Sequence, residues 1–200
     1  MSKPSATSQN EPVTARSVSR VKRIGMHWAM AAALAGLLSA CAAGNRAAAP
    51  AVPDSLQVPS GQRLLLKARA EGVQIYVCGP THDDPNRFDW SLKAPEAQLF
   101  DQGGKPIIKH YAGPSWEAAD GSKVVGEVVA RDNGPDPMAI QWLLLRAKST
   151  GGNGILSPTQ TIQRLNTVGG KPPQGGCGAG LAGSEVRVHY TANYLFYGAG

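Results

Sequence analysis

The sequence VRVHYTANYLFY, residues 186–197, alternates apolar or aromatic side chains with mostly polar ones. Its even-numbered positions share one face of an extended chain, and they are Val186, Val188, Tyr190, Ala192, Tyr194 and Phe196. A period of two residues is typical of a β-strand that buries one face. This stretch therefore predicts a long strand near the C-terminus whose even-numbered residues point into a core.

The same alternation recurs upstream. In residues 73–78 it predicts a buried face of Val73, Ile75 and Val77, and in residues 88–93 one of Phe88, Trp90 and Leu92. Residues 64–68, 123–130 and 139–147 are further strand candidates, and the one helix candidate is a turn or two near residues 157–164. Gly, Asp and Pro punctuate these runs as turn residues do. We predict an all-β fold, a single antiparallel β-sandwich or barrel-like domain with long Gly/Pro-rich loops.

The N-terminal region is organised like an export signal. A basic segment containing Arg16, Arg20, Lys22 and Arg23 precedes an apolar run from Trp28 to Ala40. Leu38-Ser39-Ala40-Cys41 resembles the lipobox of bacterial lipoproteins, which implies cleavage after Ala40 and lipidation of Cys41. Ordinary cleavage elsewhere and a membrane anchor are the alternatives, but the run is shorter than the roughly 20 apolar residues of a spanning helix.

The domain organisation follows from this signal. Residues 1–40 are the predicted lipoprotein signal peptide, the Ala/Pro-rich residues 41–60 a tether, and residues 61–197 one all-β domain. The expected location is the bacterial cell envelope, as an outer-membrane lipoprotein facing the periplasm or the surface, with the membrane as partner through Cys41. Ala42 supports the outer membrane, because it is not the aspartate that resembles an inner-membrane retention signal.

The charge of the chain belongs largely to the signal. Residues 1–40 hold five of the 20 basic residues and one of the 14 acidic ones, which leaves a net charge of +2 on the remainder. The remaining Lys and Arg are scattered singly along the sequence. A nucleic-acid-binding domain needs a clustered basic face, so we expect no nucleic-acid partner.

Two cysteines remain after Cys41. Exported proteins meet an oxidising compartment in which disulfides persist. Only one intramolecular pairing is then possible, Cys78 with Cys177. The alternative is a pair of buried free thiols.

The densest group of chemically useful residues is HYAGPSWEAADGS, residues 110–122. His110, Trp116 and Asp120 could bind a glycan or another envelope component, with the indole stacked on a sugar face. In a purely structural interpretation Trp116 is a core residue, Asp120-Gly121 a hairpin turn and His110 a surface strand residue. A hydrolase using His110 with Asp120 or Glu117 as acid and base is the enzymatic alternative, and a scaffold without a small ligand is a third.

Other candidates are fewer. Arg164 could clamp a carboxylate or phosphate, or brace the loop that follows it. His82-Asp83-Asp84 offers metal-ligand atoms, but three adjacent residues rarely converge on one ion, so a solvated loop is expected. Phosphate-loop, dinucleotide-binding and zinc-protease motifs are absent. We therefore expect no cofactor and no metal, and a binding or structural module rather than an enzyme.

The order of several motifs resembles an uncharacterised family of exported bacterial and fungal proteins, the domain-of-unknown-function family numbered 3455. The motifs that carry the resemblance are Tyr76-Val-Cys78, Phe88-Asp-Trp90, His110-x-x-Gly-Pro-x-Trp116, Asp120-Gly-Ser122, Ile162-Gln-Arg164 and Tyr190-x-Ala-x-Tyr194. The resemblance extends over residues 53–197. It implies a shared architecture, places both cysteines and residues 110–122 among the family's motif positions, and supplies no substrate.

Overall fold

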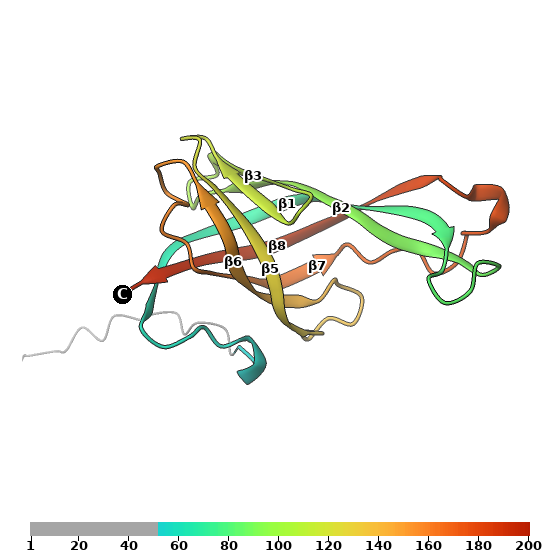
Figure 1. Cartoon of the computed structure of the whole chain (residues 1–200), viewed down its shortest axis with the longest axis horizontal. Coiled ribbons are helices and arrows are strands. Elements are labelled where there is room, and N and C mark those ends of the chain that lie inside the picture. Colours follow the sequence, from blue (N-terminus) through green and yellow to red (C-terminus); the bar gives the residue numbers. More distant parts are fainter. Residues whose placement is uncertain (1–51) are drawn as a thin grey trace, which may run out of the picture. The chain divides into compact units, whose positions relative to one another are not determined.

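The structure is a computed structural model that describes residues 52–200. Eight antiparallel strands form one sheet that closes into a barrel in chain order, with the last strand paired to the first (Figure 1). The strands are β1 (Gln62–Pro80), β2 (Phe88–Phe100), β3 (Pro106–Tyr111), β4 (Ser115–Ala118), β5 (Lys123–Asp132), β6 (Trp142–Gly151), β7 (Thr161–Gly169) and β8 (Glu185–Ala199). The all-β prediction is confirmed, and the architecture is the barrel. The predicted signal peptide and Cys41 lie outside the described residues.

Strand β8 has the buried face that its alternation predicts. Tyr190, Ala192, Tyr194 and Phe196 are at most 2% exposed, and they point into the barrel. Val186 and Val188 are only half-buried. The reason is that this end of β8 continues beyond the barrel together with β1 and β2 as a three-stranded extension (Figure 1).

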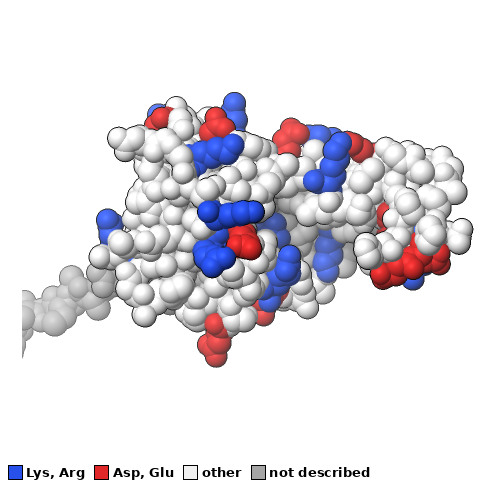
Figure 2. Space-filling model, in the orientation of Figure 1, with Lys and Arg blue, Asp and Glu red and all other residues white. Residues whose placement is uncertain are grey.

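The tip of this extension is acidic and exposed. Figure 2 shows acidic side chains gathered there, and the turn between β1 and β2 contains Asp83 and Asp84. His82 forms a contact of 3.2 Å with Asp83 in the same turn, and both side chains are fully solvent-exposed. Within the described residues no group of His, Cys, Asp or Glu side chains is arranged to hold a metal ion.

The predicted inward face of β1 is wrong. Val73 and Val77 lie half-buried on the outer face, whereas Gln74, Tyr76 and Cys78 are buried on the inner one. Of the predicted set only Ile75, next to a register shift in the pairing with β2, is buried. Ala68 and Ala70, which come earlier in β1, lie on the same inner face and belong to the barrel core. The barrel interior is polar at this end, so the more apolar set of residues does not mark the inner face.

The helix predicted near residues 157–164 is also wrong, because the chain turns at residues 155–158 and then enters strand β7. Both faces of β7 are covered, which hides its alternation. Ile162 packs inside the barrel, whereas Leu165 packs outside it. The hairpin of β3 and β4, which carries His110 and Trp116, was not predicted as a pair of strands.

Two hydrophobic clusters hold the domain together. The larger one fills the barrel around Trp116, Tyr194 and Phe196. The smaller one lies on the outer face, where a single turn of 3-10 helix, η1 (Asp54–Leu56), inserts the fully buried Leu56 beside Trp142, Leu144 and Leu165. Gln163 Nε2 also donates to the Leu56 carbonyl over 2.7 Å. Residues 52–58, part of the predicted tether, thus pack on the barrel. Within residues 52–200 no helix has the length and apolarity needed to cross a bilayer.

Candidate functional site

A cavity of about 440 Å³ lies inside the end of the barrel at which the extension begins. We call it the mouth cavity. All eight strands contribute to its wall, for example through Gln74, Lys93, His110, Trp116, Arg131, Leu143, Arg164 and Tyr194, in strand order. Small eight-stranded barrels either fill their interior with side chains or hold one small ligand. In this barrel side chains fill the interior at one end, and the mouth cavity leaves room for a small ligand at the other.

Aromatic side chains form the inner wall of the mouth cavity. The His110 ring stacks on Trp116 with centroids 4.4 Å apart and planes 8° from parallel, and Tyr194 packs edge-on against both rings. Gly126 on β5 allows this arrangement, because a Cβ atom there would lie 3.0 Å from Trp116 Cζ3. Trp116 is 1% exposed, which confirms it as a core residue.

His110 is buried and neutral. Burial lowers the pKa of its imidazole to about 3, and the positive charge of Arg164 acts in the same direction, although the hydrogen bond with Ser115 opposes them. Nδ1 lies 2.8 Å from the Ser115 carbonyl oxygen, which can only accept, so Nδ1 carries the proton. The remaining nitrogen, Nε2, is then a hydrogen-bond acceptor. An imidazole with so low a pKa is a poor general base near neutral pH.

Two residues of the cavity lining carry N–H donors without a partner. Gln74 Nε2 and Trp116 Nε1 are buried and find no hydrogen-bond acceptor among residues 52–200. A buried donor without a partner costs about 1–3 kcal/mol. Native proteins rarely leave such groups unsatisfied, so we expect a bound water or ligand to accept a hydrogen bond from each of them.

The charged groups around the mouth cavity are all basic. Its lining includes Lys93, Arg131, Arg164 and Lys171, and no Asp or Glu of the described part of the chain. Lys93 is paired with Glu185, and Lys171 Nζ donates to the Pro137 carbonyl over 2.6 Å. Arg131 forms no ion pair within residues 52–200.

Arg164 is half-buried and has two roles. Its Nε and Nη2 donate to the Gln141 carbonyl over 3.1 and 2.9 Å, so it braces the segment before β6 and not, as predicted, the loop that follows it. Its charge lowers the pKa of His110, and it opposes the larger effect of burial on the pKa of Tyr76, which is raised overall. The positive charge of the guanidinium is therefore felt by the side chains inside the cavity. Its Nη1 group takes no part in the hydrogen bonds to Gln141.

The structure separates Asp120 from the other predicted site residues. Asp120 Oδ1 accepts hydrogen bonds from the Ser122 hydroxyl and backbone N–H over 2.6 and 2.9 Å, and Oδ2 accepts one from the Ile155 N–H over 2.8 Å. The bonds from Ser122 and then Ile155 lower the pKa of this carboxyl. The prediction that Asp120-Gly121 forms a hairpin turn is confirmed, and Asp120 is not part of the mouth cavity.

The proposed acid–base pairs are not formed. Glu117 points outward, where it accepts a hydrogen bond of 2.7 Å from the Tyr111 hydroxyl, and it does not face His110. The idea of Trp116 as an exposed stacking platform is also wrong, because its indole is buried. His110, assigned to the surface in the structural interpretation, is 3% exposed. Three predicted residues, His110, Trp116 and Arg164, nevertheless meet in one cavity.

Sequence reasoning missed Gln74, Arg131 and Lys171. A signal existed for Gln74, which is the polar residue in the otherwise apolar run VQIYVC. Arg131 and Lys171 carry no such signal, because each is an isolated basic residue near a turn. Only barrel closure brings them to the same cavity.

The predicted disulfide is present. Cys78 and Cys177 are joined, with Cα atoms 5.5 Å apart. The bond fastens the glycine-rich segment after β7 to the inner face of β1. Tyr76 supports the same contact, since its hydroxyl donates to the Gly170 carbonyl over 2.7 Å, and Trp90 Nε1 donates to the Gly175 carbonyl over 2.9 Å.

The fold and this cavity define a small closed antiparallel β-barrel with a polar, basic internal site. The chain belongs to the family described as Protein of unknown function (DUF3455), whose model matches residues 59–198. The match covers the barrel and confirms the resemblance seen in the sequence. A search of curated proteins and a search of solved structures each found no match.

Proposed function

We propose that this protein is a cell-envelope lipoprotein whose barrel binds a small organic anion in the mouth cavity. The observation that carries the proposal is the lining of the cavity. Four basic side chains line it, two further lining residues carry unpartnered buried donors, and no Asp or Glu of residues 52–200 is in the lining.

The chemistry of this lining favours a carboxylate or phosphate group. Arginine presents several N–H donors in a planar fork that matches such groups, and charge-assisted hydrogen bonds are stronger than neutral ones. Partial exclusion of water strengthens the attraction further. A cavity of about 440 Å³ is within the range that small-molecule ligands occupy.

Binding rather than catalysis is favoured for two reasons. The cavity lining offers no carboxylate within the described residues to pair with His110, and the low pKa of His110 makes its imidazole a weak base. Nε2 of His110 is better suited to accept a hydrogen bond from a ligand O–H or N–H group. This would orient the ligand without transferring a proton.

Anion binding can be followed at Trp116 by NMR. The full chain, purified in mild detergent, is titrated with citrate, inorganic phosphate and glucose 6-phosphate at low ionic strength. We expect the indole N–H resonance of Trp116 to move, because a bound anion changes the field at the cavity wall and offers an acceptor. The indole resonance of Trp142, which packs in the outer cluster, should stay in place.

Two substitutions at the cavity and one away from it sharpen this experiment. Losing a hydrogen bond to a charged group costs about 1.5–3 kcal/mol, so Arg164→Gln should weaken binding about ten- to a hundredfold. Arg131→Gln should weaken it less and leave folding intact, because this exposed side chain braces nothing. Arg187→Gln is the matched control, since Arg187 pairs with Glu96 at 2.9 Å on the outer surface. If no anion moves Trp116, or if all three variants bind equally, the scaffold hypothesis takes the place of this proposal.

Membrane attachment is the second part of the proposal, and it rests on the lipobox-like sequence at Cys41. Each acyl CH₂ group buried in a bilayer contributes about 0.8 kcal/mol, so a multiply acylated cysteine is a stable anchor. We expect Cys41→Ala to move the protein from the membrane fraction to the soluble fraction after cell lysis. A Cys41→Ala protein that sediments with membranes as the parent does would contradict the assignment.

A further inference from the structure

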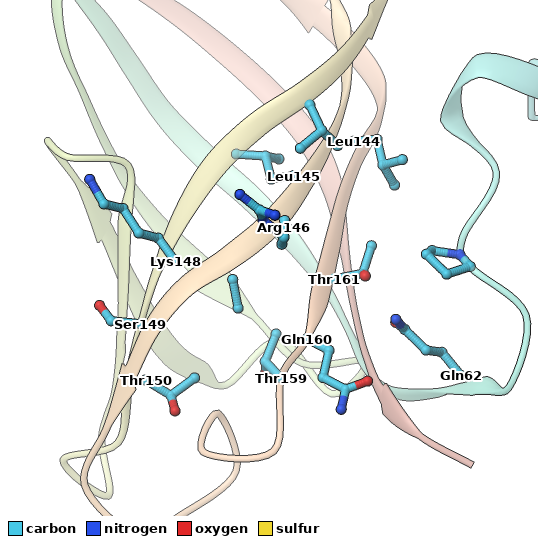
Figure 3. Close-up of a pocket in the computed structure, with 13 residues that line it drawn as sticks. Gln62, Leu144, Leu145, Arg146, Lys148, Ser149, Thr150, Thr159, Gln160 and Thr161 are labelled. Carbon is cyan, nitrogen blue, oxygen red and sulfur yellow. The ribbon is translucent and has the colours of Figure 1, made fainter.

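A second concave site lies on the outside of the barrel between β6 and β7 (Figure 3). The two strands pair only along residues 143–146 and 161–164. Beyond them one more bond joins the Ala147 N–H to the Gln160 carbonyl over 2.8 Å, while the Gln160 N–H donates to the Tyr197 carbonyl over 2.7 Å. Strand β6 therefore continues beside β5, whereas the segment before β7 turns toward β8. The divergence opens a cleft of about 600 Å³, here called the β6–β7 cleft.

The β6–β7 cleft is lined by neutral hydrogen-bonding side chains. Its hydroxyl and amide groups come from Ser149, Thr150, Thr159, Thr161, Gln62 and Gln160. In Figure 3 the hydroxyl-bearing residues of β6 lie across the opening from Gln62, with residues 159–161 between them. Such groups can both donate and accept, as sugar hydroxyls do.

Apolar and basic groups complete the walls. Pro59, Val129 and Leu144 supply apolar surface, and Val129 is 52% exposed. Arg146 stands at the β6 side but is already paired with Glu127 at 2.8 Å. Lys148 is exposed on the same side and forms no ion pair within residues 52–200. The cleft thus has two basic side chains, against four at the mouth cavity, and the rest of its lining is hydroxyl, amide and C–H surface.

Two polar atoms of this cleft's residues are buried without a partner. They are Thr159 Oγ1 and Gln62 Oε1, neither of which forms a hydrogen bond within residues 52–200. The amide oxygen of Gln62 only accepts, so the group that satisfies it must bring a donor. A carboxylate or a fully ionised phosphate brings none, whereas a hydroxyl does.

We infer that the β6–β7 cleft binds a saccharide. The hydroxyls of a sugar ring match the alternating donors and acceptors of the Thr, Ser and Gln side chains, and the C–H face of a ring suits Pro59, Val129 and Leu144. Pro59, Ser149 and Thr150 at its edges are exposed, so a saccharide can enter from solvent. This inference uses residues separate from the mouth cavity and does not rest on the proposed anion binding.

Thr159→Val gives the most direct test, because it is nearly isosteric and removes a hydroxyl that has no partner in the protein. The full chain is titrated with chitotriose, cellotriose and maltotriose, and the backbone amide resonances of Ser149 and Thr150 are followed by NMR. We expect at least one trisaccharide to move them. Thr159→Val should weaken that binding about three- to tenfold, the effect of one neutral hydrogen bond, and should not lower the melting temperature.

Thr191→Val on β8 is the matched control, since Thr191 does not line the cleft and its loss should leave saccharide binding unchanged. Gln62→Met is a second variant that removes the orphaned acceptor and should weaken binding to a similar extent. The inference fails if none of the three trisaccharides moves the Ser149 and Thr150 resonances at millimolar concentration. It also fails if Thr159→Val and Gln62→Met bind as tightly as Thr191→Val. Citrate titrations at Trp116 report on the mouth cavity independently of either result.

Discussion

Trp116→Ala is expected to lower the free energy of unfolding by about 3–5 kcal/mol, the usual cost of truncating a large buried aromatic residue. The indole is 1% exposed, stacks on His110 and packs edge-on against Phe196 with centroids 6.1 Å apart. The backbone of Gly126 lies directly against its ring, so the strands cannot easily close over the void. Chemical denaturation of the full chain, followed by circular dichroism, measures the change.

Trp90→Ala is the matched control for this loss. Trp90 lies on the extension and is only half-buried, although its indole N–H donates to the Gly175 carbonyl. Its removal should cost clearly less than the removal of Trp116. Equal losses for the two variants, or a loss at Trp116 below about 1 kcal/mol, would place the Trp116 indole outside the core.

Removal of the disulfide should produce an effect of similar size. Cys78 and Cys177 are 99 residues apart, and a crosslink that closes a loop of this length is worth about 2–5 kcal/mol. The bond holds a glycine-rich segment that contributes no residue to either hydrophobic cluster. We expect Cys78→Ser/Cys177→Ser to unfold at a lower denaturant concentration than the oxidised parent, and non-reducing peptide mapping of the parent to recover the linked pair.

The reductant provides the control for the disulfide. The parent protein treated with dithiothreitol should unfold as the double variant does, and dithiothreitol should not change the variant. A double variant as stable as the oxidised parent would show that the bond contributes nothing to stability. A parent whose two thiols are alkylated without prior reduction would show that the bond is not formed.

The candidate site was predictable only in part. His110 and Trp116 were found because they belong to the densest group of chemically useful residues, and Arg164 because it lies in a polar cluster before a Gly-Gly turn, but the role of each stayed open. The local pattern of residues 110–122 favoured a buried Trp116 but also permitted an exposed one, and it placed Asp120 beside His110. In the structure β4 alternates its side chains, so Trp116 points inward and Glu117 outward, and Asp120 is used by the turn that follows.

The strands differ in how well the two-residue alternation of the sequence predicts which of their faces is buried. In β8 the even-numbered residues from Tyr190 to Phe196 are in the core, so the alternation and the burial agree there. In β1 the inner face carries Gln74 and Tyr76 because it borders the mouth cavity, and the more apolar face lies outside. In β7 both faces are covered, by the barrel core on one side and by Leu56 on the other, and no alternation survives.

The amino-acid sequence by itself determined the all-β class, the long C-terminal strand, the Asp120-Gly121 turn and, given export, the only possible cysteine pairing. These features depend on residue types and on spacings of a few positions, which a linear chain expresses directly. Only the tertiary structure decided that the sheet closes, which face of β1 is inside, and that Gln74, His110, Arg131 and Arg164 share one cavity. Closure pairs β1 with β8, more than 100 residues apart, and the register of eight strands sets which side chains meet. That register is a property of the whole sheet and has no local signature in the chain.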